Sequence, residues 1–62
     1  MKLVDAFNEA LNIRGLLISK GYSRYQVANM KRNLKAGKVS IELMRRVVKD
    51  AGYTLQYEEN WI

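Results

Sequence analysis

The chain has 62 residues, of which 48% are hydrophobic, and a formal net charge of +5 from 11 Lys or Arg against 6 Asp or Glu. A chain this short forms one small domain that buries about 60% of the surface of its unfolded form. The composition is too apolar for a disordered tail, and no uncharged run is long enough to span a bilayer. We therefore expect a soluble globular domain that does not contact a membrane.

Cysteine and histidine are both absent. This excludes disulfides, thiolate metal sites and nucleophiles activated by imidazole, so we predict no metal and no cofactor. Glu58 and Glu59 are adjacent carboxylates on opposite faces of an expected strand, and there is no glycine-rich phosphate loop, so the sequence does not predict an enzyme. Asp5 and Glu9 interrupt any signal-peptide core, which favours a cytoplasmic location.

Glycines and serines mark the expected ends of helices. Three glycines fit the position just after a helix, where a left-handed backbone costs glycine nothing; these are Gly21, Gly37 and Gly52. Ser23 and Gln26 have the spacing of a capping box, and Ser40 is placed to cap a further helix. The pattern predicts three helices, which cover residues 2–20, 24–36 and 41–51.

The first predicted helix has a broad apolar face and two features that interrupt it. Arg14 falls inside the apolar stripe, which favours a side chain that is internally paired or that extends along the surface to water, with a phosphate contact as the alternative. Gly15 lies in mid-helix, at a cost of about 1 kcal/mol relative to Ala, and marks a place where the helix could bend or break. The helix over 41–51 is amphipathic and is expected to act mainly as scaffold.

Apolar residues alternate after Gly52, which predicts one strand over 53–61. A solitary strand must pair with the stretch at Lys38 and Val39, lie over the helices, or pair with its own copy across a two-fold axis. We favour the last, because it would enlarge a small core. The expected dimer interface then consists of Leu55, Tyr57 and Trp61. The predicted fold class is mostly α, a three-helix domain with a C-terminal β-strand that pairs across a homodimer.

Positive charge is concentrated in the middle of the chain. Residues 14–49 carry a local charge of +9, whereas residues 1–13 sum to −1 and residues 50–62 sum to −3. Solubility faces usually mix both signs, and this segment does not. A polyanionic partner is therefore favoured over an ordinary solvated surface.

The helix over 24–36 has a thin apolar stripe and a broad polar face. That face offers cations for phosphates, amide and guanidinium groups for base edges, and a small residue, Ala28, for close approach. Its predicted nucleic-acid-binding residues are Arg24, Tyr25, Asn29, Lys31, Arg32, Asn33, Lys35 and, in the following loop, Lys38. A second basic cluster on the next helix is expected to position phosphates; it consists of Arg45, Arg46 and Lys49.

Residues 16–57 resemble the lambda-repressor-like (Xre-type) helix-turn-helix family of phage and bacterial regulators. The resemblance lies in residues 21–28, which are similar to the family's entry into its second helix, and in residues 33–38, which are similar to the end of its recognition helix. Residues 40–43 and 51–53 are similar to the next helix and its termination. The family has a glycine turn at the place that lies between Ala28 and Asn33 in this sequence. That turn is missing here, so two helices would merge into one over 24–36. The resemblance implies phosphate-side roles for Ser23, Arg24 and Lys38.

The sequence thus favours a sequence-specific, double-stranded DNA-binding protein, a small transcriptional regulator of phage, plasmid or bacterial type. RNA remains an alternative, because the cationic face does not discriminate B-form from A-form geometry. The other alternative is a small protein-protein interaction module, an adaptor or inhibitor that uses the basic helix and the Tyr57 and Trp61 face.

Overall fold

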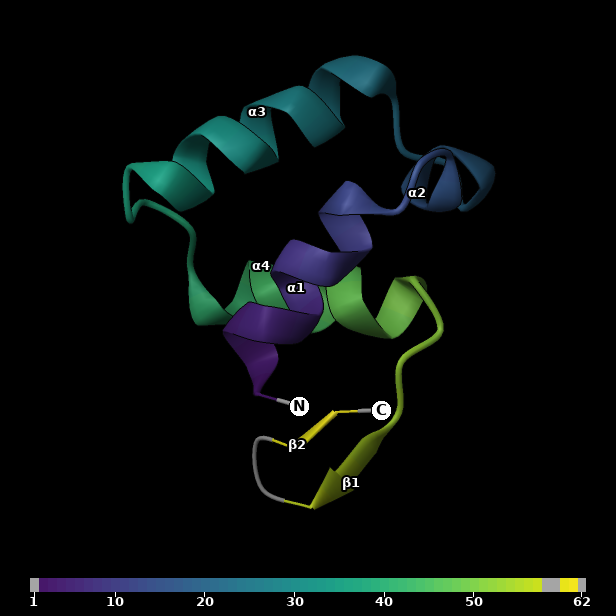
Figure 1. The fold of residues 1–62 in the computed structure, drawn as a ribbon, viewed down its shortest axis with the longest axis vertical. Helices are drawn as coiled ribbons and strands as arrows, with labels where there is room; N and C mark the ends of the chain where they lie inside the picture. The colour runs from purple at the N-terminus through teal and green to yellow at the C-terminus, as the bar shows by residue number, and fades with distance from the viewer. Residues whose placement is uncertain (1, 58–59, 62) are drawn as a thin grey trace.

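The computed structural model describes residues 2–57 and 60–61, and the side chains of residues 2–54. In this part of the chain four helices are followed by two short strands: α1 (Leu3–Asn12), α2 (Leu16–Ser19), α3 (Arg24–Lys35), α4 (Ile41–Asp50), β1 (Leu55–Tyr57) and β2 (Asn60–Trp61). Figure 1 shows α2 and α3 at one end of the molecule, α1 and α4 in the middle, and the strands at the other end. The prediction of a mostly helical fold is confirmed.

The first helix is not continuous over 2–20 as expected. α1 ends at Asn12, Ile13 is extended, and Gly15 has φ 78°, a left-handed conformation that only glycine adopts without strain. The chain therefore turns before the short helix α2. The apolar period continues across this turn in the sequence, interrupted only by Arg14 and Gly15.

Local hydrogen bonds fix both ends of α3. The Ser23 hydroxyl accepts from the Gln26 backbone N–H at 3.0 Å, and the Ser23 N–H donates to Gln26 Oε1 at 2.8 Å, so the predicted capping box forms. At the other end the Lys38 N–H donates to the Asn33 carbonyl and the Gly37 N–H to the Leu34 carbonyl, which is a Schellman motif. α3 is thus a separate helix with defined ends.

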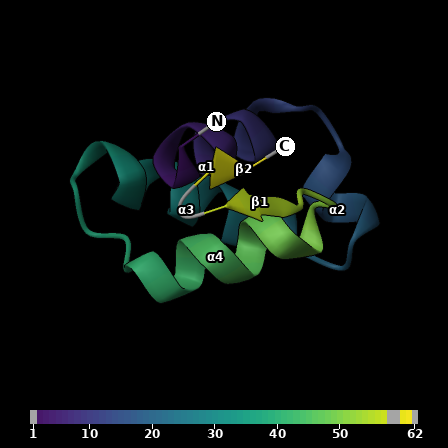
Figure 2. The ribbon, with the colours of Figure 1, turned by 90° about the horizontal axis from the view of Figure 1, so that it is seen from below.

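α1 and α4 lie side by side and form most of the core (Figure 2). Phe7, Val47 and Val48 are fully buried between them. The other buried hydrophobic residues of the described chain are Leu3, Ala6, Ala10, Leu11, Leu17, Met30, Met44 and Ala51. Ile41 begins the apolar stripe of α4 in the sequence but is 58% exposed, because it lies at the first position of the helix.

The structure does not contain one strand over 53–61. β1 pairs antiparallel with β2 of the same chain, with Leu55 opposite Trp61 and Tyr57 opposite Asn60. A partner a few residues away costs little loop-closure entropy, and it satisfies one edge of the ladder without a second chain. The side chains of the predicted dimer interface, Leu55, Tyr57 and Trp61, lie outside the described residues, so pairing between copies stays a prediction.

Among the helices described, none combines the length and the apolar character needed to cross a bilayer.

Candidate nucleic-acid interface

α3 meets the rest of the domain along one narrow edge. Met30 is buried, and Val27 and Leu34 are partly buried against the core. The opposite side of the helix is open to solvent, and Tyr25 is 75% exposed there although it is a large aromatic residue. A 12-residue helix is about 18 Å long, so this open side forms a rigid polar surface.

The cations of α3 form a row beside the apolar edge. Arg24, Lys31 and Lys35 are spaced by seven and four residues, which places them on one side of a helix, and all three are exposed. Ala28 lies in the same row and leaves a gap between the long side chains. That these cations project together toward a partner stays a prediction.

A second row faces further from the core. Tyr25, Asn29 and Arg32 follow one another at steps of four and three residues, and Arg32 Nη1 donates to Asn29 Oδ1 at 3.2 Å. Tyr25 and Arg32 are exposed, whereas Asn29 is half-buried. The bond fixes the end of the guanidinium near the amide and leaves its other N–H donors free for a ligand.

Asn33 and Lys38 extend the polar surface at the C-terminal end of α3. Both are exposed. They are joined through the backbone, since the Lys38 N–H donates to the Asn33 carbonyl at 2.9 Å. This bond holds Lys38 directly beside the end of α3, although the residue itself lies in the loop.

The structure separates the three predicted cations of α4. Arg46 lies one turn before Asp50, whose carboxylate accepts a hydrogen bond from Tyr22, so Arg46 is on the side of α4 that faces Tyr22. Arg45 and Lys49 share the neighbouring row, which is turned by about 100°. Arg46 therefore lies near Tyr22, and the phosphate-positioning roles of Arg45, Arg46 and Lys49 stay predictions.

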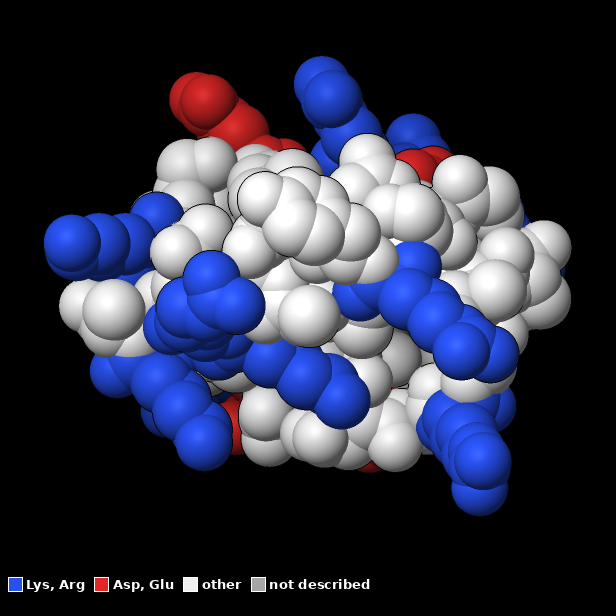
Figure 3. All heavy atoms as spheres, turned by 90° about the horizontal axis from the view of Figure 1, so that it is seen from above, with Lys and Arg blue, Asp and Glu red and all other residues white. Residues whose placement is uncertain are grey.

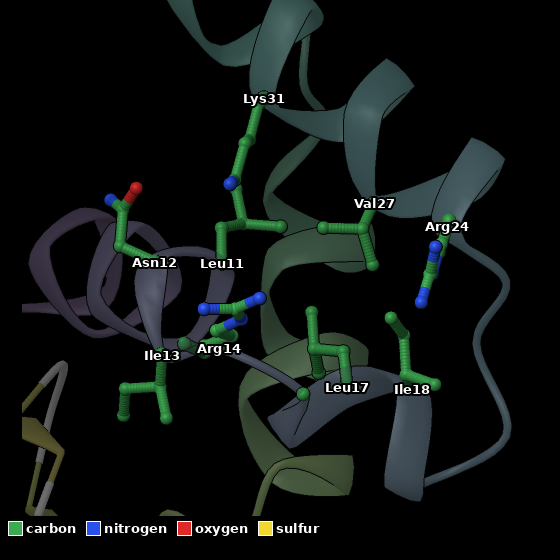
Figure 4. Close-up of a pocket in the computed structure, with 11 residues that line it drawn as sticks. Leu11, Asn12, Ile13, Arg14, Leu17, Ile18, Arg24, Val27 and Lys31 are labelled. Atoms are coloured by element: carbon green, nitrogen blue, oxygen red, sulfur yellow. The ribbon is translucent and has the colours of Figure 1, made fainter.

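Sequence reasoning gave a phosphate contact for Arg14 only as the alternative and did not group it with the binding residues of α3. A continuous helix over 2–20 placed this residue inside an apolar stripe, whereas the break at Gly15 leaves it exposed in a turn. There it lines a groove together with Arg24 and Lys31 of α3 (Figure 4). The signal that could have found it was the cost of a glycine in mid-helix.

Two tyrosines brace the helices that carry this surface. The Tyr22 hydroxyl donates to Asp50 Oδ2 at 2.7 Å, and the Tyr53 hydroxyl donates to Glu9 Oε1 at 2.8 Å. Burial and the adjacent carboxylate raise the pKa of each tyrosine to about 12. Tyr22 thereby ties the entry of α3 to the C-terminal end of α4, and Tyr53 ties the segment after α4 to α1.

The charge distribution on this side of the molecule follows from these placements. Figure 3 looks onto the α3 end and shows blue Lys and Arg side chains around a patch of uncharged atoms, with red Asp and Glu atoms mainly toward the rim. Within residues 14–49 the sequence offers Glu42 as the sole carboxylate. Such a surface attracts a polyanion and repels cations. In the described part of the chain, no group of three or more carboxylates is placed to hold a metal ion.

Comparison of the chain with models of protein families, with curated proteins and with solved structures found no match.

Proposed function

We propose that the protein binds double-stranded DNA through the exposed face of α3 and acts as a small transcriptional regulator. The observation that carries the proposal is the one-signed polar face of α3, which is attached to the core by a single thin edge and is uncovered along its length. A helix of this width fits the major groove of B-form DNA.

In this proposal one row of α3 contacts phosphates and the other contacts bases. Arg24, Lys31 and Lys35 are long point charges along one side, a placement suited to phosphates. Arg32 can present two N–H donors to a guanine edge, and its bond to Asn29 holds it in that direction. The other residues proposed to face the bases are Tyr25 and Asn33.

Lys38 and Arg46 extend the phosphate contacts beyond the ends of the base-reading row. With Arg24, Lys31, Lys35 and Arg14 they would neutralise about six phosphates, which predicts a slope of about −5 for the logarithm of affinity against the logarithm of salt concentration. A titration of duplex binding against salt measures this slope. Absence of any duplex retention at low ionic strength would refute the proposal.

Two substitutions on α3 separate base reading from phosphate binding. Lys35→Ala should weaken binding to all duplexes alike and lower the salt slope by about 1. Arg32→Ala should instead cost about 1–3 kcal/mol on the preferred sequence and change the preference itself. Binding to randomised duplexes, followed by sequencing of the retained pool, measures both effects.

Lys2→Ala is the matched control for these variants. It removes the same charge, but Lys2 precedes α1 near the end of the molecule opposite to α3. Its slope and its sequence preference should equal those of the unmodified protein. Equal effects of Arg32→Ala and Lys35→Ala on every sequence would show that α3 does not read bases.

The proposal includes a homodimer formed through the β1–β2 pair. This pair and α3 lie at opposite ends of the long axis, which measures 31 Å, so such a dimer leaves both α3 faces uncovered. A two-fold symmetric consensus in the retained pool would support it. A measured mass of one chain at micromolar concentration would refute the dimer and leave DNA binding through one α3 intact.

A further inference from the structure

A groove of about 480 Å³ lies between α3 and the turn that joins α1 to α2. Figure 4 shows Arg24 and Lys31 reaching from α3 toward the groove, while Arg14 reaches toward it from the turn. No Asp or Glu is among the residues that line it. Three cations from two separate segments therefore line this groove, with Arg14 and Lys31 on one side of Val27 and Arg24 on the other, and no acid lines it.

The inner surface of this groove is apolar. Leu17 is buried at its base, Val27 is partly buried and points into it, and Ile18 reaches it although 44% of its surface stays exposed. An exposed isoleucine beside three cations gains from a ligand that covers its carbon atoms. The groove thus offers charge at the rim and apolar contact inside.

We propose that this groove binds a small organic anion with an apolar body, such as a medium-chain or aryl carboxylate. The carboxylate would lie between Arg14 and Lys31, and the apolar body would cover Leu17, Ile18 and Val27 in the direction of Arg24. Charge-assisted hydrogen bonds from Arg and Lys are the strong contacts for a carboxylate. The volume lies within the range of about 300–1,000 Å³ that is typical of small-molecule sites.

A ligand that has only a charge, or only an apolar body, would use only part of the groove. A bare anion such as phosphate would leave the apolar surface wet, and a neutral apolar molecule would leave the three cations without a partner. A ligand that carries both features removes apolar surface from water and also neutralises charge. The site does not depend on DNA binding, so it can be tested without nucleic acid.

The test uses three probes at constant ionic strength. Sodium octanoate, kept below its critical micelle concentration, is titrated into the full chain and followed by ¹⁵N–¹H correlation spectra. We expect saturable shifts centred on the amides of residues 10–18 and 24–31.

Two control probes each carry one feature of octanoate. Acetate supplies the charge without the alkyl chain, and octanol supplies the alkyl chain without the charge. Each should bind at least about tenfold more weakly than octanoate. Equal binding of octanoate and acetate, or of octanoate and octanol, would overturn the proposal.

Substitutions then test which residues hold the probe. Arg14→Gln and Lys31→Gln should each weaken octanoate binding roughly tenfold, and Ile18→Ser should weaken it without disturbing the core, since Ile18 is partly exposed. Lys2→Gln is the matched control, because it removes one cation outside the groove. A loss in the control as large as in Lys31→Gln would show that octanoate responds to net charge, and this too would overturn the proposal.

Discussion

The α1–α4 pair and α3 differ in how much of their surface is buried. α1 and α4 bury whole faces against each other, whereas within Arg24–Lys35 only Met30 is buried. The residues that determine the fold and those offered to a partner are thus on different helices. Substitutions on the open face of α3 should change binding without changing the fold, and those between α1 and α4 should do the reverse.

The largest expected loss of stability comes from a substitution between α1 and α4. Phe7 is fully buried, and Phe7→Ala should cost about 3–5 kcal/mol, which is comparable with the whole stability that one small core provides. The variant should be largely unfolded at room temperature. Tyr25→Ala also removes an aromatic ring, but from the exposed face of α3, and should change the free energy of unfolding by less than about 0.5 kcal/mol.

Urea denaturation followed by circular dichroism measures both variants on the same scale. A loss in Tyr25→Ala as large as that in Phe7→Ala would mean that the α3 face is packed in solution, for instance against a second copy. The contrast between the two regions would then be wrong.

The next largest loss of stability is expected in the turn that separates α1 from α2. Gly15 has φ 78°, and no atom lies within 4 Å of where a Cβ would be, so Gly15→Ala introduces backbone strain and no clash. We expect a loss of about 1–2 kcal/mol. Gly15→Asn should lose less, because asparagine tolerates the left-handed region. A gain in stability for Gly15→Ala would show that the chain readily forms the continuous helix over 2–20.

The sequence predicts best where the determinants are local. The ends of α3 and α4 depend on caps within a few residues, at Ser23 and Ser40 and after Ala36 and Ala51, and the observed bounds differ from the predicted ones by one residue. The break before α2 was named as a possibility at Gly15, but a continuous helix over 2–20 was preferred because the apolar period runs on through it. The pairing of β1 with β2 was missed because alternation shows a strand but not where it reverses.

In the candidate site, too, the features that depend on local sequence could be predicted and those that depend on the fold could not. Cations on one helix could be grouped by their spacing, and Arg24–Lys35 is a single helix in the structure. Arg14 could not be added from spacing, because its position beside Arg24 and Lys31 depends on the turn at Gly15. The split of Arg46 from Arg45 and Lys49 likewise depends on how α4 packs, which the amphipathic pattern gives only for its buried side.

The smallest effect tests the tyrosines that join the two regions. The pKa of Tyr22 and of Tyr53 is raised from 10 to about 12, so their stabilisation is complete below pH 10 and is lost as the pH rises to about 12. Tyr22→Phe should cost about 1 kcal/mol at pH 7, because it leaves Asp50 without its donor. The double variant Tyr22→Phe with Tyr53→Phe should show a weaker loss of stability between pH 10 and pH 12 than the unmodified protein.

The double variant differs from the unmodified protein only at Tyr22 and Tyr53, so the difference between the two unfolding profiles reports on these two hydroxyl groups. Identical profiles would show that the two hydroxyl bonds do not stabilise the fold. Because Tyr22 alone reaches the entry of α3, Tyr22→Phe should also loosen that helix more than Tyr53→Phe does. Amide hydrogen exchange within α3 measures this, since a looser attachment raises exchange there before it raises exchange in α1 and α4.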